Sequence, residues 1–243
     1  MEFKEQNVIV TGGTRGIGKG IAENFLKKGA NVLVTYSGNK VAAEEFISAN
    51  AEYKEQIFTD CFNVADSKAC EDFFARLPFE KVHVLVNNAG IRKDNIVAMM
   101  PTDDWQNVLD INLTGTFNMC KAAVMKMSRQ RYGRIINITS PCSHFGFAGQ
   151  ANYAASKAGQ IGLTRSLSKE VAKRKITVNC ISPGFIGTDL IADLPEKLVD
   201  EYKQQIPMKR FGTVEEVANC VSFLASEQAS YITGTTLEVS GGL

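Results

Sequence analysis

Short runs rich in β-branched residues alternate with longer segments of helical periodicity along almost the whole chain, and this alternation limits the possible folds more than any other feature. The predicted strands cover residues 7–11, 31–36, 56–60, 82–87, 133–140, 177–182 and 235–239. The predicted helices cover residues 17–28, 40–50, 67–76, 103–128, 153–173 and 213–226. Strands that alternate with helices form βαβ units, in which consecutive strands are parallel and joined by right-handed crossovers.

Most of the predicted strands lack the apolar and polar alternation of a strand with one face in water. Runs such as Val-Leu-Val-Asn at 84–87 and Arg-Ile-Ile-Asn-Ile at 134–138 are typical of strands covered by helices on both faces. No Pro/Ser-rich linker, repeat or low-complexity tract divides the 243 residues. We therefore expect a single α/β domain over residues 1–243, with a Rossmann-type doubly wound parallel sheet of seven strands and helices on both faces.

The rhythm of strands and helices loosens before the last helix, where Pro183, Pro195 and Pro207 separate helix-compatible pieces. A mobile lid over a cleft has this pattern, and so does an ordinary long surface loop. We expect residues 187–211 to form a substrate lid.

Charge and composition exclude several classes of protein. The formal net charge is only +1, so no whole-molecule field would attract nucleic acid or an anionic membrane. No apolar stretch approaches the ~18 residues of a membrane span, and the first residues lack a signal-peptide pattern. The six cysteines show no C-x-x-C spacing, and neither His83 nor His144 belongs to a metal-ligand spacing. We expect a cytoplasmic protein that holds no metal and binds neither nucleic acid nor membranes.

The first predicted strand runs into a glycine-rich turn, residues 11–18, after which helical periodicity begins. Positions without side chains let the backbone approach a pyrophosphate, while free N–H groups and the positive end of the helix dipole favour its charge. The spacing is G-x-x-x-G-x-G, which differs from the commoner G-x-G-x-x-G of dinucleotide-binding turns. The residues expected to bind the cofactor here are Gly12, Thr14, Arg15, Gly16, Ile17 and Gly18.

The end of the second strand bears on the choice between NAD(H) and NADP(H). A carboxylate about 20 residues after the glycine turn usually reads the adenosine ribose, but this chain has Thr35, Tyr36 and Ser37 there. Arg15 supplies a guanidinium that can pair with a 2′-phosphate, although a solvated surface arginine is the alternative. We expect NADP(H), with Tyr36 and Ser37 beside its phosphate.

Tyr153 and Lys157 are four residues apart, so on a helix they lie on one face and can act on the same space. An ammonium one turn away favours the phenolate of a tyrosine, which otherwise has a pKa of ~10. Ser140 ends the fifth strand, and ligands of open α/β sheets collect at the carboxyl ends of strands. The three residues are the expected catalytic group. The alternative is helix packing by Tyr153 with a solvated Lys157.

The glycine turn, the Asn87-Asn88-Ala89-Gly90 segment and Tyr153-x-x-x-Lys157 together resemble the short-chain dehydrogenase/reductase family over nearly the whole chain. The resemblance implies that Asn63 and Val64 cap the adenine and that Ile186 and Thr188 contact the nicotinamide. The other cofactor-binding residues that it implies are Asn88, Ala89, Gly90, Tyr153, Lys157, Pro183 and Gly184.

Asn112 lies in a predicted helix, where asparagine is a mediocre residue. By resemblance, Asn112 kinks the helix and holds a water that relays protons to Lys157. A buried asparagine satisfied by backbone alone is the other interpretation. The family implies hydride transfer to a ketone, with Tyr153 donating the proton while Ser140 and Tyr153 polarise the carbonyl.

Residues 149–159, 88–94 and 231–234 are similar to those of the 3-oxoacyl-[acyl-carrier-protein] reductases. This similarity implies reduction of a 3-oxoacyl thioester in fatty acid synthesis, with an acyl carrier protein bound by Arg131 and Arg174. It also implies a homotetramer in which the helices of Asn112 and Tyr153 pair. Reduction of acetoacetyl-CoA, or of a sugar, steroid or quinone, stays open, as does an NADP(H) sensor without turnover.

Overall fold

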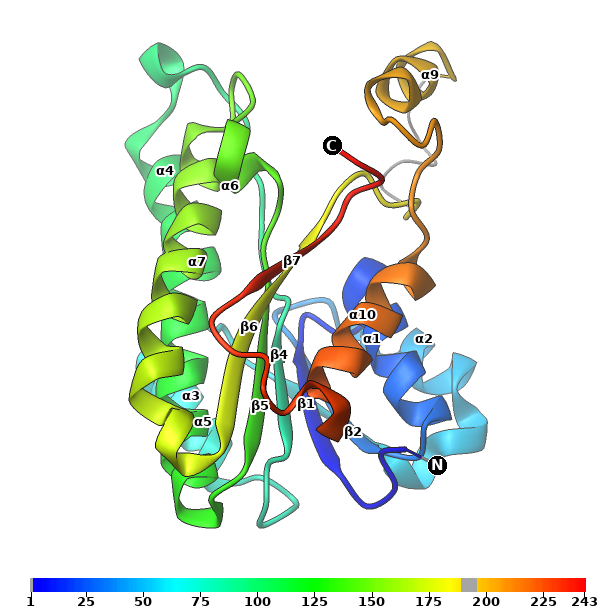
Figure 1. The fold of residues 1–243 in the computed structure, drawn as a ribbon, viewed down its shortest axis with the longest axis vertical. Coiled ribbons are helices and arrows are strands. Elements are labelled where there is room, and N and C mark those ends of the chain that lie inside the picture. Colours follow the sequence, from blue (N-terminus) through cyan, green and yellow to red (C-terminus); the bar gives the residue numbers. More distant parts are fainter. Residues whose placement is uncertain (1, 189–195) are drawn as a thin grey trace.

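The computed structural model describes residues 2–188 and 196–243. In this part of the chain, seven parallel strands form one sheet in the order β3-β2-β1-β4-β5-β6-β7 (Figure 1). The strands are β1 (Asn7–Thr11), β2 (Asn31–Tyr36), β3 (Ile57–Cys61), β4 (Val84–Asn87), β5 (Gly133–Ile138), β6 (Ile176–Pro183) and β7 (Thr236–Val239). The predicted doubly wound Rossmann-type sheet is therefore confirmed.

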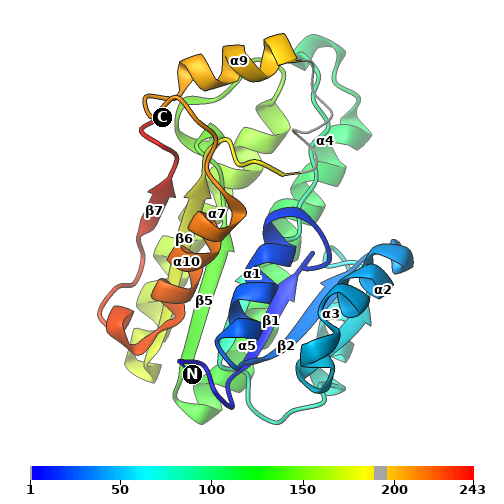
Figure 2. The same ribbon diagram turned by 90° about the vertical axis from the view of Figure 1, so that its right-hand side faces the viewer.

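Helices cover both faces of the sheet, as Figures 1 and 2 show. One face carries α1 (Gly16–Lys27), α2 (Lys40–Ala49) and α10 (Val214–Ala225). The opposite face carries α3 (Ser67–Ala75), α5 (Gly115–Gln130) and α7 (Ala151–Val171). Toward the carboxyl ends of the strands lie α4 (Thr102–Leu109), α6 (Cys142–Phe145) and α9 (Glu196–Gln205).

Successive strand residues divide between these two faces. In β1, Val8 and Val10 join the cluster under α1 and α10, whereas Ile9 joins the cluster under α3 and α5. All three side chains are fully buried. The uninterrupted apolar runs follow from this arrangement, since each strand must present apolar side chains in both directions.

The order of the strands in the sheet determines where a ligand crevice is expected. β1 pairs with β2 on one side and with β4 on the other, so the connections leave the carboxyl ends of β1 and β4 in opposite directions. Open α/β sheets bind ligands at such a switch point. The glycine turn follows β1, and Asn88 follows β4, so both lie at this point.

The structure corrects the sequence prediction in two places. The single helix predicted over 103–128 is α4 and α5 joined by a π-helical turn at Asp110–Thr114, because an extra residue is accommodated there and the Thr116 hydroxyl donates to the Asn112 carbonyl (2.7 Å). The short helix α6 was not predicted. Of the expected lid over 187–211, residues 189–195 lie outside the described residues, and α9 occupies part of the remainder. The lid stays a prediction.

Candidate active site

The turn between β1 and α1 depends on glycine at defined positions. Gly12 and Gly16 have φ angles of +62° and +53°, in the left-handed region that glycine adopts without strain. A Cβ on Gly18 would lie 2.3 Å from the Gly12 carbonyl oxygen. The spacing noted in the sequence therefore follows from backbone geometry as well as from close packing of α1 on the turn.

The first turn of α1 fits an anionic group. Its N-cap residue Arg15 makes no side-chain cap hydrogen bond, and the first turn carries no acidic residue. A Cβ on Gly16 would meet no atom within 4 Å, so the surface above this residue is open. Backbone N–H groups at an uncapped helix N-terminus, with the positive end of its dipole, suit the diphosphate of a dinucleotide.

Asn88 holds this turn from the neighbouring strand. Its Nδ2 donates to the carbonyl oxygens of Thr11 and Gly12, both at 3.0 Å, and its backbone N–H donates to Thr11 Oγ1 at 3.0 Å. The N–H of Ala89 donates to the same hydroxyl, also at 3.0 Å. The two predicted cofactor segments are thus one hydrogen-bonded unit.

The residues predicted at the adenosine end also gather near the glycine turn. The N–H of Gly13 donates to the Thr35 carbonyl (3.2 Å), which ties the turn to the end of β2, immediately before Tyr36 and Ser37. Arg15, two residues after Gly13, is exposed. Across the sheet edge, Val64 is buried, and its carbonyl accepts from Asn118 Nδ2 (3.0 Å).

Asn63, next to Val64, is exposed. Its Oδ1 already accepts from the N–H of Ala65 (3.0 Å), so the amide oxygen stabilises a local turn. The Nδ2 group is the part of Asn63 suited to reading an adenine edge.

At the predicted nicotinamide end, β6 finishes at Pro183 and the chain turns away. The N–H of Gly184 donates to the Val239 carbonyl (3.0 Å), and a Cβ on Gly184 would lie 2.8 Å from Ser240 Cα. Ile186 is buried and forms a parallel bridge with Gly212. Thr188 is half-buried at the last described position before the gap.

The three predicted catalytic residues meet beyond the carboxyl end of β5. Lys157 Nζ lies 5.6 Å from the centroid of the Tyr153 ring and donates to the Ile138 carbonyl oxygen at 2.7 Å. Ser140 follows β5 by two residues and lies close enough to Tyr153 to act on the pKa of its phenol. A Cβ on Gly90 would lie 3.7 Å from Lys157 Nζ, so this group adjoins the cofactor segments.

Burial has the largest influence on the pKa values of Lys157 and Tyr153. It lowers the pKa of Lys157 to about 8, because the ammonium is removed from water. It also raises the pKa of the Tyr153 phenol; Ser140 and Arg92 act in the opposite direction, while Cys142 and Asp94 raise it further. The expected lowering of the Tyr153 pKa was therefore wrong, since desolvation outweighs the lowering by Ser140 and Arg92.

Asn112 is fully buried in the π-helical turn. Its Oδ1 accepts from the Ile91 N–H (2.8 Å), while its Nδ2 donates to the Ile91 carbonyl (3.0 Å) and to Ser156 Oγ (3.1 Å). Satisfaction by backbone alone is wrong, because Ser156 contributes its side chain. Asn112 thus links the segment after Gly90 to the helix of Tyr153. The implied water relay stays a prediction.

The carbonyl of Asn112 has partners that the sequence did not suggest. It accepts from Thr116 Oγ1 (2.7 Å) and from Gln160 Nε2 (2.8 Å). Gln160 lies one turn beyond Ser156 on α7 and is fully buried. The sequence signal for this contact is the four-residue spacing of Ser156 and Gln160, which puts both on one face of a helix.

Arg131 and Arg174 lie at the other end of the sheet. Arg131 is the C-cap of α5, and Arg174 ends the 3₁₀ turn after α7. The strands that follow them pair through Gly133 and Ile176, so the two arginines share one edge. The two arginines therefore lie near each other, but they lie at the opposite end of the sheet from Ser140.

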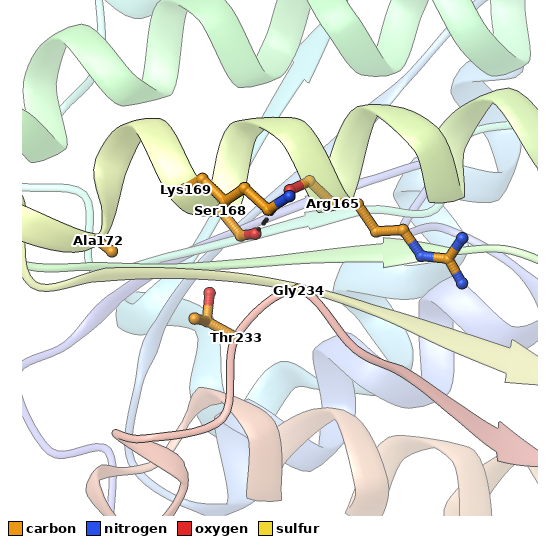
Figure 3. Close-up of a pocket in the computed structure, with 6 residues that line it drawn as sticks. All are labelled: Arg165, Ser168, Lys169, Ala172, Thr233 and Gly234. Carbon is orange, nitrogen blue, oxygen red and sulfur yellow. Dashed lines mark hydrogen bonds between the residues drawn. The ribbon is translucent and has the colours of Figure 1, made fainter.

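A groove of about 390 Å³ lies along the same half of α7 (Figure 3). It is lined by Arg165, Ser168, Lys169, Ala172, Thr233 and Gly234. None of these residues was predicted to act in catalysis, and the Arg165 guanidinium points away from Thr233 and Gly234. The Ser168 hydroxyl already donates to the Arg165 carbonyl (3.1 Å), and the Thr233 hydroxyl already accepts from the Val178 N–H (3.0 Å). The groove is separate from the candidate site.

Two expected absences can be examined in the described ranges. No helix within residues 2–188 or 196–243 has the length and apolar character needed to cross a membrane. Over the same residues, no group of three or more His, Cys, Asp or Glu side chains could hold a metal ion.

Comparison with known proteins gives full-length similarities. A family described as Enoyl-(Acyl carrier protein) reductase matches residues 12–243. The chain is 44% identical over 240 residues to a 3-oxoacyl-[acyl-carrier-protein] reductase of Staphylococcus epidermidis, covering 98% of both proteins. It is 44% identical over 253 residues to that of Aquifex aeolicus, covering both completely. It is 42% identical over 247 residues to that of Salmonella typhimurium, covering 100% of this chain and 99% of the relative.

Proposed function

The chain belongs to the short-chain dehydrogenase/reductase family, and we propose that it uses NADPH to reduce a 3-oxoacyl thioester to the 3-hydroxyacyl thioester in fatty acid synthesis. The thioester is carried by an acyl carrier protein, as in the names of its relatives. The cytoplasm is the expected location.

One observation carries the proposal: Ser140, Tyr153 and Lys157 gather beside the segment that holds the glycine turn. Lys157 lies over the Tyr153 ring, and the position of Gly90 is within contact distance of Lys157 Nζ. A proton donor, a hydroxyl group and a cation therefore surround the place where the family binds nicotinamide.

The proposed mechanism divides the work among these side chains. The glycine turn and the segment Asn88–Gly90 would hold the dinucleotide, whose reduced nicotinamide would supply a hydride for the carbonyl carbon. The hydroxyls of Ser140 and Tyr153 donate to the carbonyl oxygen, and Tyr153 transfers its proton as negative charge develops there. The raised pKa of Tyr153 keeps the phenol protonated at neutral pH, as an acid must be. Lys157, with a pKa of about 8, exchanges protons near neutral pH and is suited to resupply the phenol.

The preference for NADPH rests on Arg15. Arg15 is exposed in the glycine turn, which Gly13 ties to the end of β2, and Tyr36 and Ser37 stand there in place of a carboxylate. A planar guanidinium pairs well with phosphate oxygens, and no acid at this position repels them.

The distance of the proposed carrier-binding arginines from Ser140 has a consequence for the proposed homotetramer. Arg131 and Arg174 lie at the amino ends of β5 and β6, roughly 20 Å from Ser140 given the rise of a six-residue strand. A carrier protein held by them would therefore serve a neighbouring subunit of the proposed homotetramer more readily than their own.

The substrate assignment is tested by following NADPH oxidation with a 3-oxoacyl carrier protein, acetoacetyl-CoA and a cyclic ketone, each repeated with NADH. We expect the largest kcat/KM for the carrier-linked substrate with NADPH. Tyr153→Phe should reduce kcat by roughly 10²–10⁴-fold without changing the melting temperature, because it removes only the acid. Turnover of the cyclic ketone alone would refute the proposed substrate, and a preference for NADH would refute the proposed cofactor. Near-normal activity of Tyr153→Phe would refute the role of Tyr153 as the acid.

A further inference from the structure

Two neighbouring cations after Ile91 make different ion pairs. Arg92 holds Asp94 with two contacts, Nε to Oδ1 at 3.2 Å and Nη2 to Oδ2 at 2.8 Å. Lys93 instead reaches Asp104 of α4, with 2.5 Å between Nζ and Oδ1. The two pairs differ in what their carboxylates contact next: Asp94 also accepts from Gln150, whereas Asp104 lies on α4.

Gln150, immediately before α7, continues the contacts of Asp94 toward the site. Its Nε2 donates to Asp94 Oδ2 (3.0 Å), and its Oε1 accepts from the Cys142 thiol (3.4 Å). A carboxylate can only accept, so Asp94 determines which end of the amide faces Cys142. Cys142 is buried, and this raises its pKa, which keeps it a thiol able to donate.

The last contact reaches Ser140. The backbone N–H of Cys142 donates to Ser140 Oγ (3.3 Å), and Ser143 Oγ donates to the Ser140 carbonyl (2.7 Å). The amide occupies one acceptor site of the Ser140 hydroxyl, so its proton is directed elsewhere. That proton can then be donated to another acceptor, such as the carbonyl oxygen of a substrate.

We propose that Gln150 is a positioning residue for Ser140, acting through Cys142 and itself oriented by the Asp94–Arg92 pair. This inference rests on the proposed function, in which Ser140 polarises the carbonyl. The ion pair alone would contribute little, because its side chains are 52% and 36% exposed. Its effect here is geometric: it holds the carboxylate that orients the amide.

The matched control is the neighbouring pair. Lys93 and Asp104 side chains are 41% and 32% exposed, similar to Arg92 and Asp94, but their contact leads to α4 and not to Gln150. Lys93→Met should therefore leave kcat unchanged, whereas Arg92→Met should lower it.

The deciding experiment is a double-mutant cycle between Gln150→Ala and Ser140→Ala, with kcat and KM for NADPH measured for each variant. Gln150→Ala should lower kcat roughly threefold to tenfold, the value of one hydrogen bond, with KM for NADPH unchanged. In the Ser140→Ala background the same change should lower kcat no further, because Gln150 acts through that hydroxyl. Equal losses in both backgrounds, or no loss in either, would overturn the inference.

Two further measurements separate the possible failures. If Gln150→Ala lowers the melting temperature too far for assay, Asp94→Ala removes the group that orients the amide and should show the same dependence on Ser140. If Ser140→Ala itself keeps full activity, the proposed function fails, independently of Gln150.

Discussion

The two faces of the sheet are built differently. Under α1 and α10 most of the buried side chains are apolar, including Val8, Val10 and Phe25, and Ser222 is the buried polar side chain on α10. Under α5 and α7, the part nearer the carboxyl ends of the strands carries a layer of buried polar and thiol side chains. This polar layer consists of Asn87, Asn112, Thr116, Cys120, Asn137, Ser156, Gln160, Thr164 and Cys180. The helix that carries Tyr153 and Lys157 is thus held largely by hydrogen bonds, whereas α1 is held mainly by the burial of apolar surface.

The side chains of the polar layer are joined by hydrogen bonds into one fixed arrangement. Asn87 Nδ2 donates to Asn137 Oδ1 (2.8 Å), and Asn137 Nδ2 donates to Thr164 Oγ1 (2.8 Å). The thiol of Cys180 donates to the same hydroxyl at 3.1 Å. Apolar side chains can repack at little cost, but a hydrogen-bonded set loses its bonds when a helix shifts. The difference suggests that one face supplies stability and the other fixes the position of α7.

The largest effect on stability is expected on the apolar face. Phe25 is fully buried, with its ring 4.9 Å from that of Phe3 in an edge-on arrangement. Phe25→Ala should destabilise the protein by about 3–5 kcal/mol, because it removes buried area and leaves a cavity. Denaturant unfolding measures the loss. The kcat of the remaining folded protein should be close to that of the wild type, and a fall in kcat comparable to that of a catalytic variant would break the comparison.

The next effect concerns the buried ammonium of Lys157, at the end of the polar layer. Because the folded state lowers the pKa of Lys157 to about 8 from 10.5, the folded chain releases this proton before the unfolded chain does. The unfolded state then binds more protons between these two values, so stability should rise with pH over that window. From about pH 7 to about pH 9.5 the gain should be roughly 2 kcal/mol.

Lys157→Met removes this group and should remove the gain. The measurement is the difference in unfolding free energy between wild type and Lys157→Met across pH, without cofactor. The difference should move in favour of the wild type as pH rises. A difference independent of pH would show that Lys157 keeps an ordinary pKa in the folded protein.

Sequence reasoning predicted the fold correctly, and it proposed catalytic residues that lie together in the structure, for a physical reason. Strand and helix periodicity are local, and the spacing of Tyr153 and Lys157 follows from a single helix. The polar layer could not be predicted, because Asn137 and Thr164 become partners only when β5 and α7 pack together. The Tyr153 pKa was predicted in the wrong direction for the same reason: spacing indicates a neighbouring cation, but burial depends on the complete fold.

A smaller effect is expected within the polar layer itself. Thr164→Val keeps the shape of the side chain but removes the hydroxyl that accepts from Asn137 Nδ2 and from Cys180 Sγ. Two buried donors would lose a partner, which should cost roughly 1–2 kcal/mol. Thermal unfolding at one pH is sufficient to measure this. If the loss were absent, the layer would stabilise α7 no more than apolar packing does.

Gln160→Leu is the matched variant on the same helix, and it should have the smallest effect. Gln160 Nε2 donates to the Asn112 carbonyl and to Thr116 Oγ1, but its Oε1 is buried without a partner in the described part of the chain. Leucine removes that costly acceptor together with the donor, and Thr116 still donates to the Asn112 carbonyl. The change in stability should therefore stay within about 1 kcal/mol. A larger loss of stability than for Thr164→Val would contradict this expectation. It would mean that the contacts around Asn112 stabilise the polar layer more than the contacts of Thr164 with the sheet.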